Sequence, residues 1–377
     1  MDELRTINFL DAFIANALSV IIPLLLVARG VSVVQIGVVV SMSPVIFVVS
    51  RSIFAAMSDQ IGIRKIFIAN GAMSIVSVMI YLAANNPLIF SIGKVFEGAR
   101  NGAIWAVNRT AVFVRRSGRK AVDEVLKTQA IRTGAAAMGI IAAGFLLNRY
   151  SFDVALVFFI ILSVILFLFS FLVEGEGRSK VKMKEIFGQL DFRRTSNLLK
   201  KTSLVGIPQS VATAIPLSLV FPLFLKSIGY DYWLIGVAIA LYYATSAFAT
   251  YLFMRMKWGR RAIWAGAFCF LAGGVMLPLL DGSLAVPLIA IMGIGDGMSN
   301  PLWETLVFNS VKGRRDVSSE IALLHTPANL SNSVGLIAAG VLVEMFGYGV
   351  VFLSCGVLFV LSFYWSFELL RESRYRL

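Results

Sequence analysis

The chain has 377 residues, of which 58% are hydrophobic and only 15% charged, and its formal net charge is +13. Soluble domains contain about 45–50% apolar and about 25% charged residues, so this composition excludes an ordinary soluble protein. Apolar runs recur from end to end, and each approaches the roughly 20 residues that cross a bilayer as a helix. We therefore predict one continuous membrane domain that crosses the lipid bilayer many times.

The excess of basic residues could indicate a nucleic-acid partner, but membrane topology explains it better. Nucleic acid binds basic patches on soluble faces, whereas bilayer-length apolar runs separate the basic residues here. We expect no nucleic-acid partner. The two cysteines, Cys269 and Cys355, lie inside apolar runs and predict neither a disulfide framework nor a metal site. We expect no metal and no cofactor.

Membrane-spanning helices can be predicted along the whole chain. The N-terminus has no basic n-region and Asp11 interrupts the first apolar run, so we expect no signal peptide and a first helix that stays in the mature protein. Twelve helices are expected, at residues 6–28, 34–57, 66–84, 88–113, 125–148, 152–173, 203–226, 232–255, 262–280, 284–310, 318–344 and 347–369.

A basic connector, 174–202, divides the chain into two halves, 1–173 and 203–377. Each half holds six of the predicted helices. Within the connector, four apolar residues at helical spacing predict a short helix along the membrane surface, with a flexible basic linker as the alternative. These residues are Met183, Ile186, Phe187 and Leu190.

The positions of the 34 Lys and Arg residues predict the orientation, because basic loops are retained in the cytoplasm. Only Arg29, Arg149 and Lys226 fall on the side opposite to the N-terminus, the connector and the C-terminus. Five more lie within predicted helices: Arg51, Lys94, Arg100, Arg109 and Arg132. We therefore predict a protein of the cell membrane with both termini in the cytoplasm.

The two halves repeat one another in sequence. Ile22-Pro23-Leu24 corresponds to Phe221-Pro222-Leu223, and the Gly139–Gly144 segment corresponds to Gly335–Gly340. Several such matches in the same order predict two six-helix bundles of related structure. Parallel repeats of this kind place a substrate site near the bilayer midplane between the halves. The repeated glycines would let the fifth and eleventh helices approach their neighbours closely.

The turn between the second and third helices carries a motif. It follows the pattern Gly-x-x-x-Asp-Arg/Lys-x-Gly and then basic residues, with Ala55 in place of the first glycine and Gln60 in place of the first basic residue. The matching residues are Asp59, Gly62, Arg64 and Lys65. With the twelve helices, the repeat and the basic central loop, this turn makes the whole chain resemble the major facilitator superfamily. Lys94 to Gly98 is similar to the Arg-x-x-x-Gly pattern of the same family.

The resemblance implies an all-α membrane fold of two pseudo-symmetric six-helix bundles and transport by alternating access. In such transporters the motif-bearing loop locks the halves together on the cytoplasmic side of the outward-facing state, with its acid near a helix N-terminus. The resemblance gives that role to Asp59, with Arg64 and Lys65 in support. The alternative for the two basic residues is that they serve only topology.

Ionisable and polar residues inside the predicted helices are the substrate-site candidates, because charges in hydrocarbon are costly and face a bundle interior or an aqueous cavity. The fourth helix aligns Lys94, Glu97, Asn101 and Trp105 on one stripe. The alternative is that the charged residues only neutralise one another. The cavity candidates are Lys94, Arg100, Asn101, Trp105, Gln129, Arg132, Asn300, Trp303 and Asn329.

Proton coupling would use a carboxyl group that faces the cavity. Asp11 is the first candidate, because it lies more than one turn inside its helix and has no basic partner there, although Arg132 of another helix could neutralise it. Glu97 is second, because Lys94 can pair with it, and Asp296 is third. His325 is the only histidine, and its ordinary pKa of about 6.5 would suit proton exchange.

The function that these observations favour is secondary active transport of a small organic solute by a monomer, coupled to protons. The sequence has no phosphate-binding loop that could hold ATP, and one histidine with two separated cysteines offers no catalytic set, so we expect no enzyme. A multidrug-type efflux pump and a non-transporting solute sensor of the same fold remain alternatives. The direction of transport and the solute stay open.

Overall fold

The computed structural model is helical throughout the residues that it describes, which are 2–115, 118–174, 195–256, 260–280, 282–311 and 317–372. It contains no strand within those ranges. The helices of the first half are α1 (Asp2–Ala28), α2 (Val33–Ile61), α3 (Ile63–Ala83), α4 (Pro87–Arg115), α5 (Gly118–Arg149) and α6 (Phe152–Ser170). Those of the second half are α8 (Asn197–Ile215), η2 (Pro216–Val220), α9 (Phe221–Ser227), α10 (Tyr232–Met256), α11 (Arg260–Met276), η3 (Gly282–Leu284), α12 (Ala285–Val311), α13 (Val317–Phe346) and α14 (Tyr348–Glu372).

The prediction of an all-α membrane protein with twelve spans is confirmed. Ten helical stretches of the described residues are long and apolar enough to cross a bilayer, with α8, η2 and α9 counting as one. The other two spans are α11, whose apolar part is the shorter Trp264–Met276, and α4. Charged residues such as Lys94, Glu97 and Arg100 make α4 less apolar than most of the other helices, so it is a span that packing must stabilise.

The seventh span differs in detail from its predicted range of 203–226. It runs from Asn197 to Ser227, and a π-helical turn interrupts it at Pro216–Val220. Proline has no backbone N–H and cannot donate the regular hydrogen bond, which makes it a common cause of such irregular turns. The short surface helix predicted at 183–190 lies outside the described residues.

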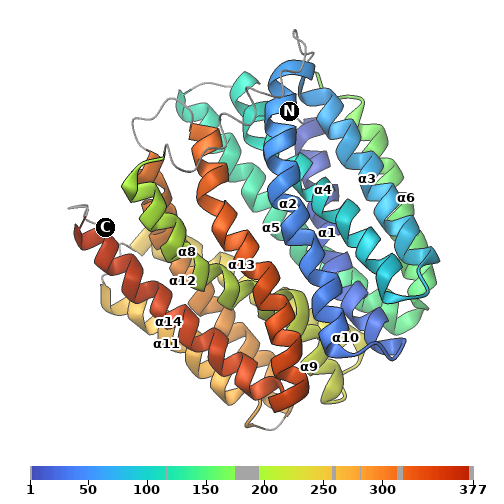
Figure 1. The fold of residues 1–377 in the computed structure, drawn as a ribbon, viewed down its shortest axis with the longest axis vertical. Helices are drawn as coiled ribbons and strands as arrows, with labels where there is room; N and C mark the ends of the chain where they lie inside the picture. The colour runs from blue at the N-terminus through green and yellow to red at the C-terminus, as the bar shows by residue number, and fades with distance from the viewer. Residues whose placement is uncertain are drawn as a thin grey trace. The chain divides into compact units, whose positions relative to one another are not determined.

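The chain forms two compact units. Unit 1 comprises Met1–Arg29 and Val39–Asp191, and unit 2 comprises Gly30–Val38 and Phe192–Leu377. In unit 1, α1 packs on α5 and α6, and α3 packs on α4 and α6. In unit 2, α8 packs on α13 and α14, and α11 packs on α12 and α14. The same pairs of helices therefore meet in both units, as the sequence repeat predicts; α3 beside α6 and α11 beside α14 can be followed in Figure 1.

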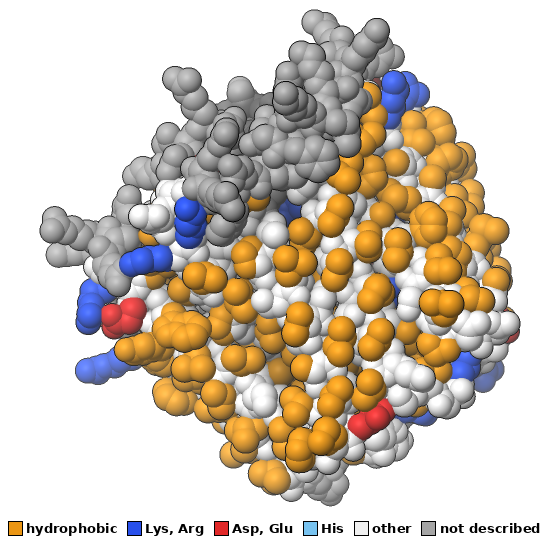
Figure 2. Space-filling model, in the orientation of Figure 1, with side chains coloured by type: hydrophobic (Ala, Val, Ile, Leu, Met, Phe, Trp, Pro, Cys, Tyr) orange, Lys and Arg blue, Asp and Glu red, His pale blue; other side chains and the backbone are white. Residues whose placement is uncertain are grey.

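Hydrophobic side chains are spread across the described part of the face drawn in Figure 2. On α6, the outward-facing side chains recur at helical spacing, and Ile161 and Leu168 are 55% and 59% exposed. A stripe of this kind would be unfavourable in water, and it is the surface that a helix presents to lipid.

Close helix contacts inside unit 2 depend on small residues. A Cβ at Gly297 of α12 would come within 2.8 Å of the Ser246 Cα of α10, so the two helices touch backbone to backbone there. In unit 1, Gly139 of α5 faces the Phe13 backbone of α1 in the same way, with a Cβ 3.0 Å from the Cα, as predicted for the fifth helix. These contacts fix the neighbours of the side chains described next.

Candidate functional site

Asp11 of α1 lies at the centre of a buried ion cluster in unit 1. Its Oδ2 atom accepts a hydrogen bond from Arg132 Nη1 of α5 at 3.0 Å, and its Oδ1 atom lies 3.9 Å from Arg100 Nε of α4. The same Arg132 nitrogen donates to Asn8 Oδ1 at 3.0 Å. Asp11 and Arg100 are 0% exposed and Arg132 is 9% exposed. The basic partner that was absent from its own helix thus comes from α5, as the alternative for Asp11 allowed.

Polar side chains of α3 complete this cluster. Asn70 Nδ2 donates to Asp11 Oδ1 at 3.2 Å and to the Arg100 carbonyl oxygen at 3.1 Å. Arg100 donates in turn to Ser74 Oγ at 3.3 Å and to Asn101 Oδ1 at 3.2 Å. The Asp11 carboxylate is therefore surrounded by two guanidinium groups and an amide.

Lys94 and Glu97 form a second buried pair in unit 1. Lys94 Nζ lies 2.9 Å from both carboxylate oxygens of Glu97, and Tyr81 of α3 donates its hydroxyl to Glu97 Oε2 at 2.7 Å. The side chains of the pair are 3% and 7% exposed. Each charge in this pair has its neutralising partner one helical turn away.

The remaining candidates of unit 1 border the Asp11 cluster. The Arg132 guanidinium lies over the Trp105 ring, 5.0 Å from its centroid, and both Asn101 and Trp105 are half-buried. Gln129 lies exposed on α5, one turn before Arg132. The structure therefore brings Arg100, Asn101, Trp105 and Arg132 together, while Gln129 is apart from the hydrogen bonds of this cluster.

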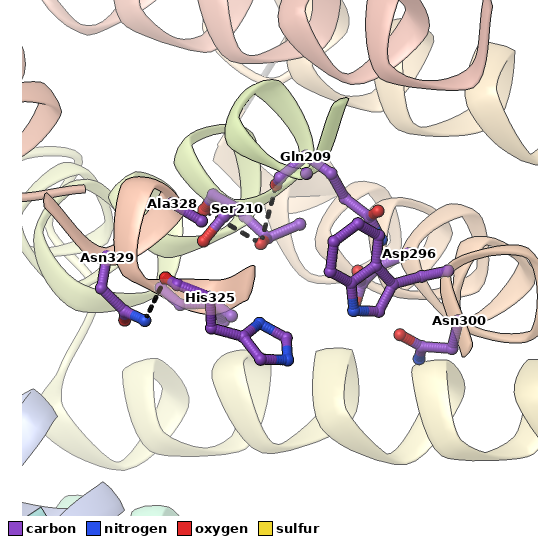
Figure 3. A pocket seen from close by; sticks show the side chains of 11 residues that line it. Gln209, Ser210, Asp296, Asn300, His325, Ala328 and Asn329 are labelled. Carbon is purple, nitrogen blue, oxygen red and sulfur yellow. Dashed lines mark hydrogen bonds between the residues drawn. The ribbon is translucent and has the colours of Figure 1, made fainter. Parts of the chain in front are cut away.

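Unit 2 contains a pocket of about 340 Å³ between α8, α12 and α13 (Figure 3). Polar groups dominate its lining, and no Lys or Arg is among the residues that the structure places there. The lining residues are Gly206, Gln209, Ser210, Thr213, Leu217, Asp296, Asn300, Trp303, His325, Ala328 and Asn329. Five of the predicted site residues thus meet in one place: Asp296, Asn300, Trp303, His325 and Asn329.

Asp296 is the acidic group of this pocket. Ser246 Oγ of α10 donates a hydrogen bond to its Oδ2 atom at 3.0 Å, and Tyr242 and Tyr243 of the same helix lie close enough to interact with it electrostatically. Within the described part of the chain, no Lys or Arg forms an ion pair with it. Asp296 therefore differs from Asp11 and Glu97, each of which has a cation within 3.0 Å.

The sequence repeat explains why the pocket is in unit 2. The alignment that pairs Pro23 with Pro222 places Ser210 where unit 1 has Asp11, and the one that pairs Gly139 with Gly335 places Ala328 where unit 1 has Arg132. Both Ser210 and Ala328 line the pocket. Two small side chains thus take the positions of a bulky ion pair, and space is left between the helices.

Three polar lining residues of α8 were missed by sequence reasoning: Gln209, Ser210 and Thr213. They lie in a long apolar run that attracts attention only as a membrane span. The spacing of Gly206, Gln209 or Ser210, Thr213 and Leu217 puts small and polar residues on one helical face. That periodicity is the signal that could have found them.

The motif between α2 and α3 is described only in part. Gly62 separates the two helices with φ 89°, a left-handed conformation that favours glycine. Arg64 is half-buried and Lys65 exposed at the start of α3, while the side chain of Asp59 lies outside the described residues. The gating role of this motif stays a prediction. Across the described residues, no group of three or more His, Cys, Asp or Glu could hold a metal ion.

Comparison with known proteins gives one consistent result. The family model of the Major Facilitator Superfamily matches residues 6–319 and 202–376. No curated protein sequence matches the chain. The crystal structure of a mutant of the nucleoside transporter NupG has a TM-score of 0.78 at 13% identity, covering 98% of both chains. A bacterial homologue of the human lysosomal transporter Spinster, inward-facing and occupied, has a TM-score of 0.74 at 13% identity, covering 98% of this chain and 96% of that one. The crystal structure of the human organic anion transporter MFSD10 has a TM-score of 0.65 at 15% identity, covering 97% of this chain and 99% of that one.

Proposed function

Because the chain belongs to the major facilitator superfamily, we propose that it is a secondary active transporter that moves a small organic solute by alternating access and couples this movement to protons. We further propose that it works as a monomer in the cell membrane with both termini in the cytoplasm. We also propose that Asp59, with Arg64 and Lys65 in support, stabilises the outward-facing state. The basic loops support this orientation.

The position of Asp296 in the pocket is the main support for proton coupling. A carboxyl group that lines a pocket and has no cation beside it is stable when protonated, and it can ionise when water or a solute reaches the pocket. Among the described residues, its neighbours on α10 are the Ser246 hydroxyl and the two tyrosines Tyr242 and Tyr243, and His325 lines the same pocket. None of these is a fixed positive charge, so none holds Asp296 permanently ionised.

Asp11 and Glu97 are less suited to this role than their sequence positions indicated. Loss of the negative charge of Asp11 would leave two buried guanidinium groups without their carboxylate, and loss of the charge of Glu97 would do the same to Lys94. Removing one charge from a buried pair is costly, on the order of 3–5 kcal/mol. We therefore propose Asp296 as the coupling residue, with His325 as its neighbour.

The test is solute accumulation by proteoliposomes under an inward proton gradient. The first labelled solutes to try are nucleosides and organic anions, the classes named for NupG and MFSD10. Wild-type protein should accumulate its solute. Asp296→Asn keeps the shape but removes the titrating group, so accumulation should be lost while solute exchange at equal pH survives.

The matched control is Glu304→Gln on the same helix, whose carboxyl is exposed and lies outside the pocket lining. It should accumulate solute as wild type does. Normal proton-driven accumulation by Asp296→Asn would remove this residue from coupling. Solute binding without any flux in wild type would instead favour the non-transporting sensor.

A further inference from the structure

We propose that the pocket of unit 2 selects an uncharged solute that joins a flat ring to several hydrogen-bond donors, with the ring resting on Trp303 and the donors meeting amide oxygens of three helices. This inference rests on the proposed transport function and names the class of its substrate.

Trp303 of α12 is held as a rigid platform. A Cβ at Gly206 of α8 would lie 2.8 Å from Cζ3 of the indole and closer still to Cη2, so the ring rests directly against the α8 backbone. Its other contacts are with a buried apolar cluster of Leu199, Val307, Val311, Ile321 and Leu324. The His325 ring of α13 lies 5.7 Å away at 60°. An aromatic surface that is fixed in this way favours the face of a second flat ring.

Three amide side chains line the pocket, and the nitrogen of each donates a hydrogen bond to another group of the protein. Gln209 Nε2 donates to Ser299 Oγ at 2.8 Å, Asn300 Nδ2 to Thr250 Oγ1 at 3.1 Å, and Asn329 Nδ2 to the His325 carbonyl oxygen at 2.9 Å. These bonds orient the amides. Within the described residues, no donor reaches the three amide oxygens, although all three side chains line the pocket.

The lining is therefore rich in acceptors. The amide oxygens of Gln209, Asn300 and Asn329 are joined by the carboxyl group of Asp296. Hydroxyl and N–H groups of a solute would satisfy these oxygens. The lining also contains the Ser210 hydroxyl and the ring nitrogens of Trp303 and His325, but no Lys or Arg among its described residues would balance the charge of a carboxylate or phosphate, which can only accept. Whenever Asp296 is ionised, repulsion between the two negative charges would disfavour such an anion as well.

The volume of the pocket and the charge of its lining restrict the class of solute further. About 340 Å³ lies at the lower end of the range for small-molecule sites, so the pocket suits a solute of one ring plus a polar group of similar size. When Asp296 carries its coupling proton, no described Asp, Glu, Lys or Arg of the lining is charged. An uncharged solute then enters without bringing an unbalanced charge into the membrane.

Binding to the purified full-length protein tests this inference without any transport. The probes are phenyl β-glucoside, which is uncharged; phenyl β-glucuronide, its carboxylate analogue; and phenyl 2-amino-2-deoxyglucoside, which is cationic at mildly acidic pH. Uridine serves as a second uncharged scaffold with ring and hydroxyl groups. Calorimetric titration should show at least one uncharged probe binding roughly 10-fold or more tighter than the glucuronide, since the anion would leave several acceptors unpaired.

Variants of the platform separate recognition from folding. Gly206→Ala should displace the indole and weaken binding of the uncharged probe by about 10-fold, and Trp303→Leu should do the same, whereas Trp303→Phe should keep most of the affinity. The control is Gly349→Ala on α14, where a new Cβ would meet only Pro278 side-chain atoms at 3.6 and 3.7 Å. It should bind as wild type does.

Binding of neither uncharged probe, equal or tighter binding of the glucuronide or the cation, or full affinity in Trp303→Leu would each overturn the inference. The proposed function fails differently. A protein that binds the uncharged probe but never accumulates it would keep this substrate class and lose coupled transport. One that accumulates organic anions would keep transport and lose the substrate class.

Discussion

Asp11 is the residue that the structure places most differently from its sequence interpretation. Its carboxylate lies between Arg132 and Arg100, fully removed from solvent, and Asn70 also donates to it. The cluster contains two guanidinium groups and one carboxylate. Removal of the single negative charge would leave two buried positive charges facing each other, so the first effect of a change at Asp11 should be on stability.

We predict that Asp11→Asn lowers the free energy of unfolding by about 3–5 kcal/mol, as expected when one member of a buried ion pair is removed. Arg132→Gln should cost a similar amount. The double variant should cost clearly less than the sum of the two single changes, because each single change leaves a charge that the other removes. Thermal unfolding of the purified protein in one detergent measures all three.

The control for this cycle is Glu368→Gln on α14. Glu368 pairs with Arg371 at 2.9 Å, but their side chains are 38% and 72% exposed, so its loss should cost no more than about 1 kcal/mol. If the Asp11 and Arg132 changes simply add, the two residues do not form an energetically coupled pair.

The residue scale also shows what the sequence could and could not predict. Lys94 and Glu97 were foreseen as a pair because they are one turn apart on one helix. The partnership of Asp11 with Arg132 joins residues 121 positions apart, and only the packing of α1 on α5 selects it from the alternatives. Asp296 ranked third because its repeat partner is glycine. The observation that now favours it is a carboxyl group without a Lys or Arg partner among the described residues, and this requires knowledge of the neighbouring helices.

At the scale of elements, the close contact between α10 and α12 sets the environment of Asp296. Gly297 follows it directly on α12 and lies against the backbone of Ser246, the residue whose hydroxyl donates to Asp296. Gly293, one turn earlier, lies equally close to the Tyr242 backbone of α10. Small residues at this spacing let two membrane helices approach closely. Because Gly293 and Gly297 have no side chains, α10 comes close enough for Ser246 to donate a hydrogen bond to the Asp296 carboxyl group.

We predict that Gly297→Ala forces α10 and α12 apart, because its Cβ would overlap the Ser246 carbonyl group. Overpacking of this kind costs about 1–3 kcal/mol, and it should also weaken proton-driven accumulation by disturbing the bond between Ser246 and Asp296. The control is Gly134→Ala on α5, where no described atom lies within 4 Å of a new Cβ. That variant should unfold at or slightly above the wild-type temperature, and an identical shift in both variants would contradict the packing explanation.

At the scale of elements, the sequence predicts spans better than their interruptions. Bilayer-length apolar runs located all twelve helices, including α4 despite its charged residues Lys94, Glu97 and Arg100. The π-helical turn at Pro216–Val220 was not predicted. The backbone groups that a proline frees in a membrane helix can be satisfied by several local geometries, and contacts with neighbouring helices select among them. Residues 210 and 213, one turn or two before it, were missed for the related reason that polar residues on a mostly apolar helix give only a weak periodic signal.

At the scale of the molecule, the two units have the same helix pairs but different interiors. Unit 1 fills the space beside α1 and α5 with the Asp11 cluster, whereas unit 2 has Ser210 and Ala328 at the matching positions and a pocket beside them. The two halves of a duplicated fold can thus have different roles. A few substitutions at equivalent positions replace the buried ion cluster of one half with a pocket in the other. This division predicts that changes in the Asp11 cluster affect stability first and that changes in the pocket affect the solute first.

The orientation of the whole molecule in the membrane is the last prediction. The basic residues gather in the loops that share one side with the N-terminus, the connector and the C-terminus, and retention of such loops in the cytoplasm sets topology. In a variant without Cys269 and Cys355, a cysteine introduced in the connector by Ser179→Cys should be unreactive towards an impermeant maleimide added to intact cells. Asn85→Cys, in the exposed turn between α3 and α4, should react under the same conditions, and both should react after the cells are lysed. Reaction at Ser179→Cys together with protection at Asn85→Cys would reverse the topology, and the distribution of basic residues would then need an explanation other than retention.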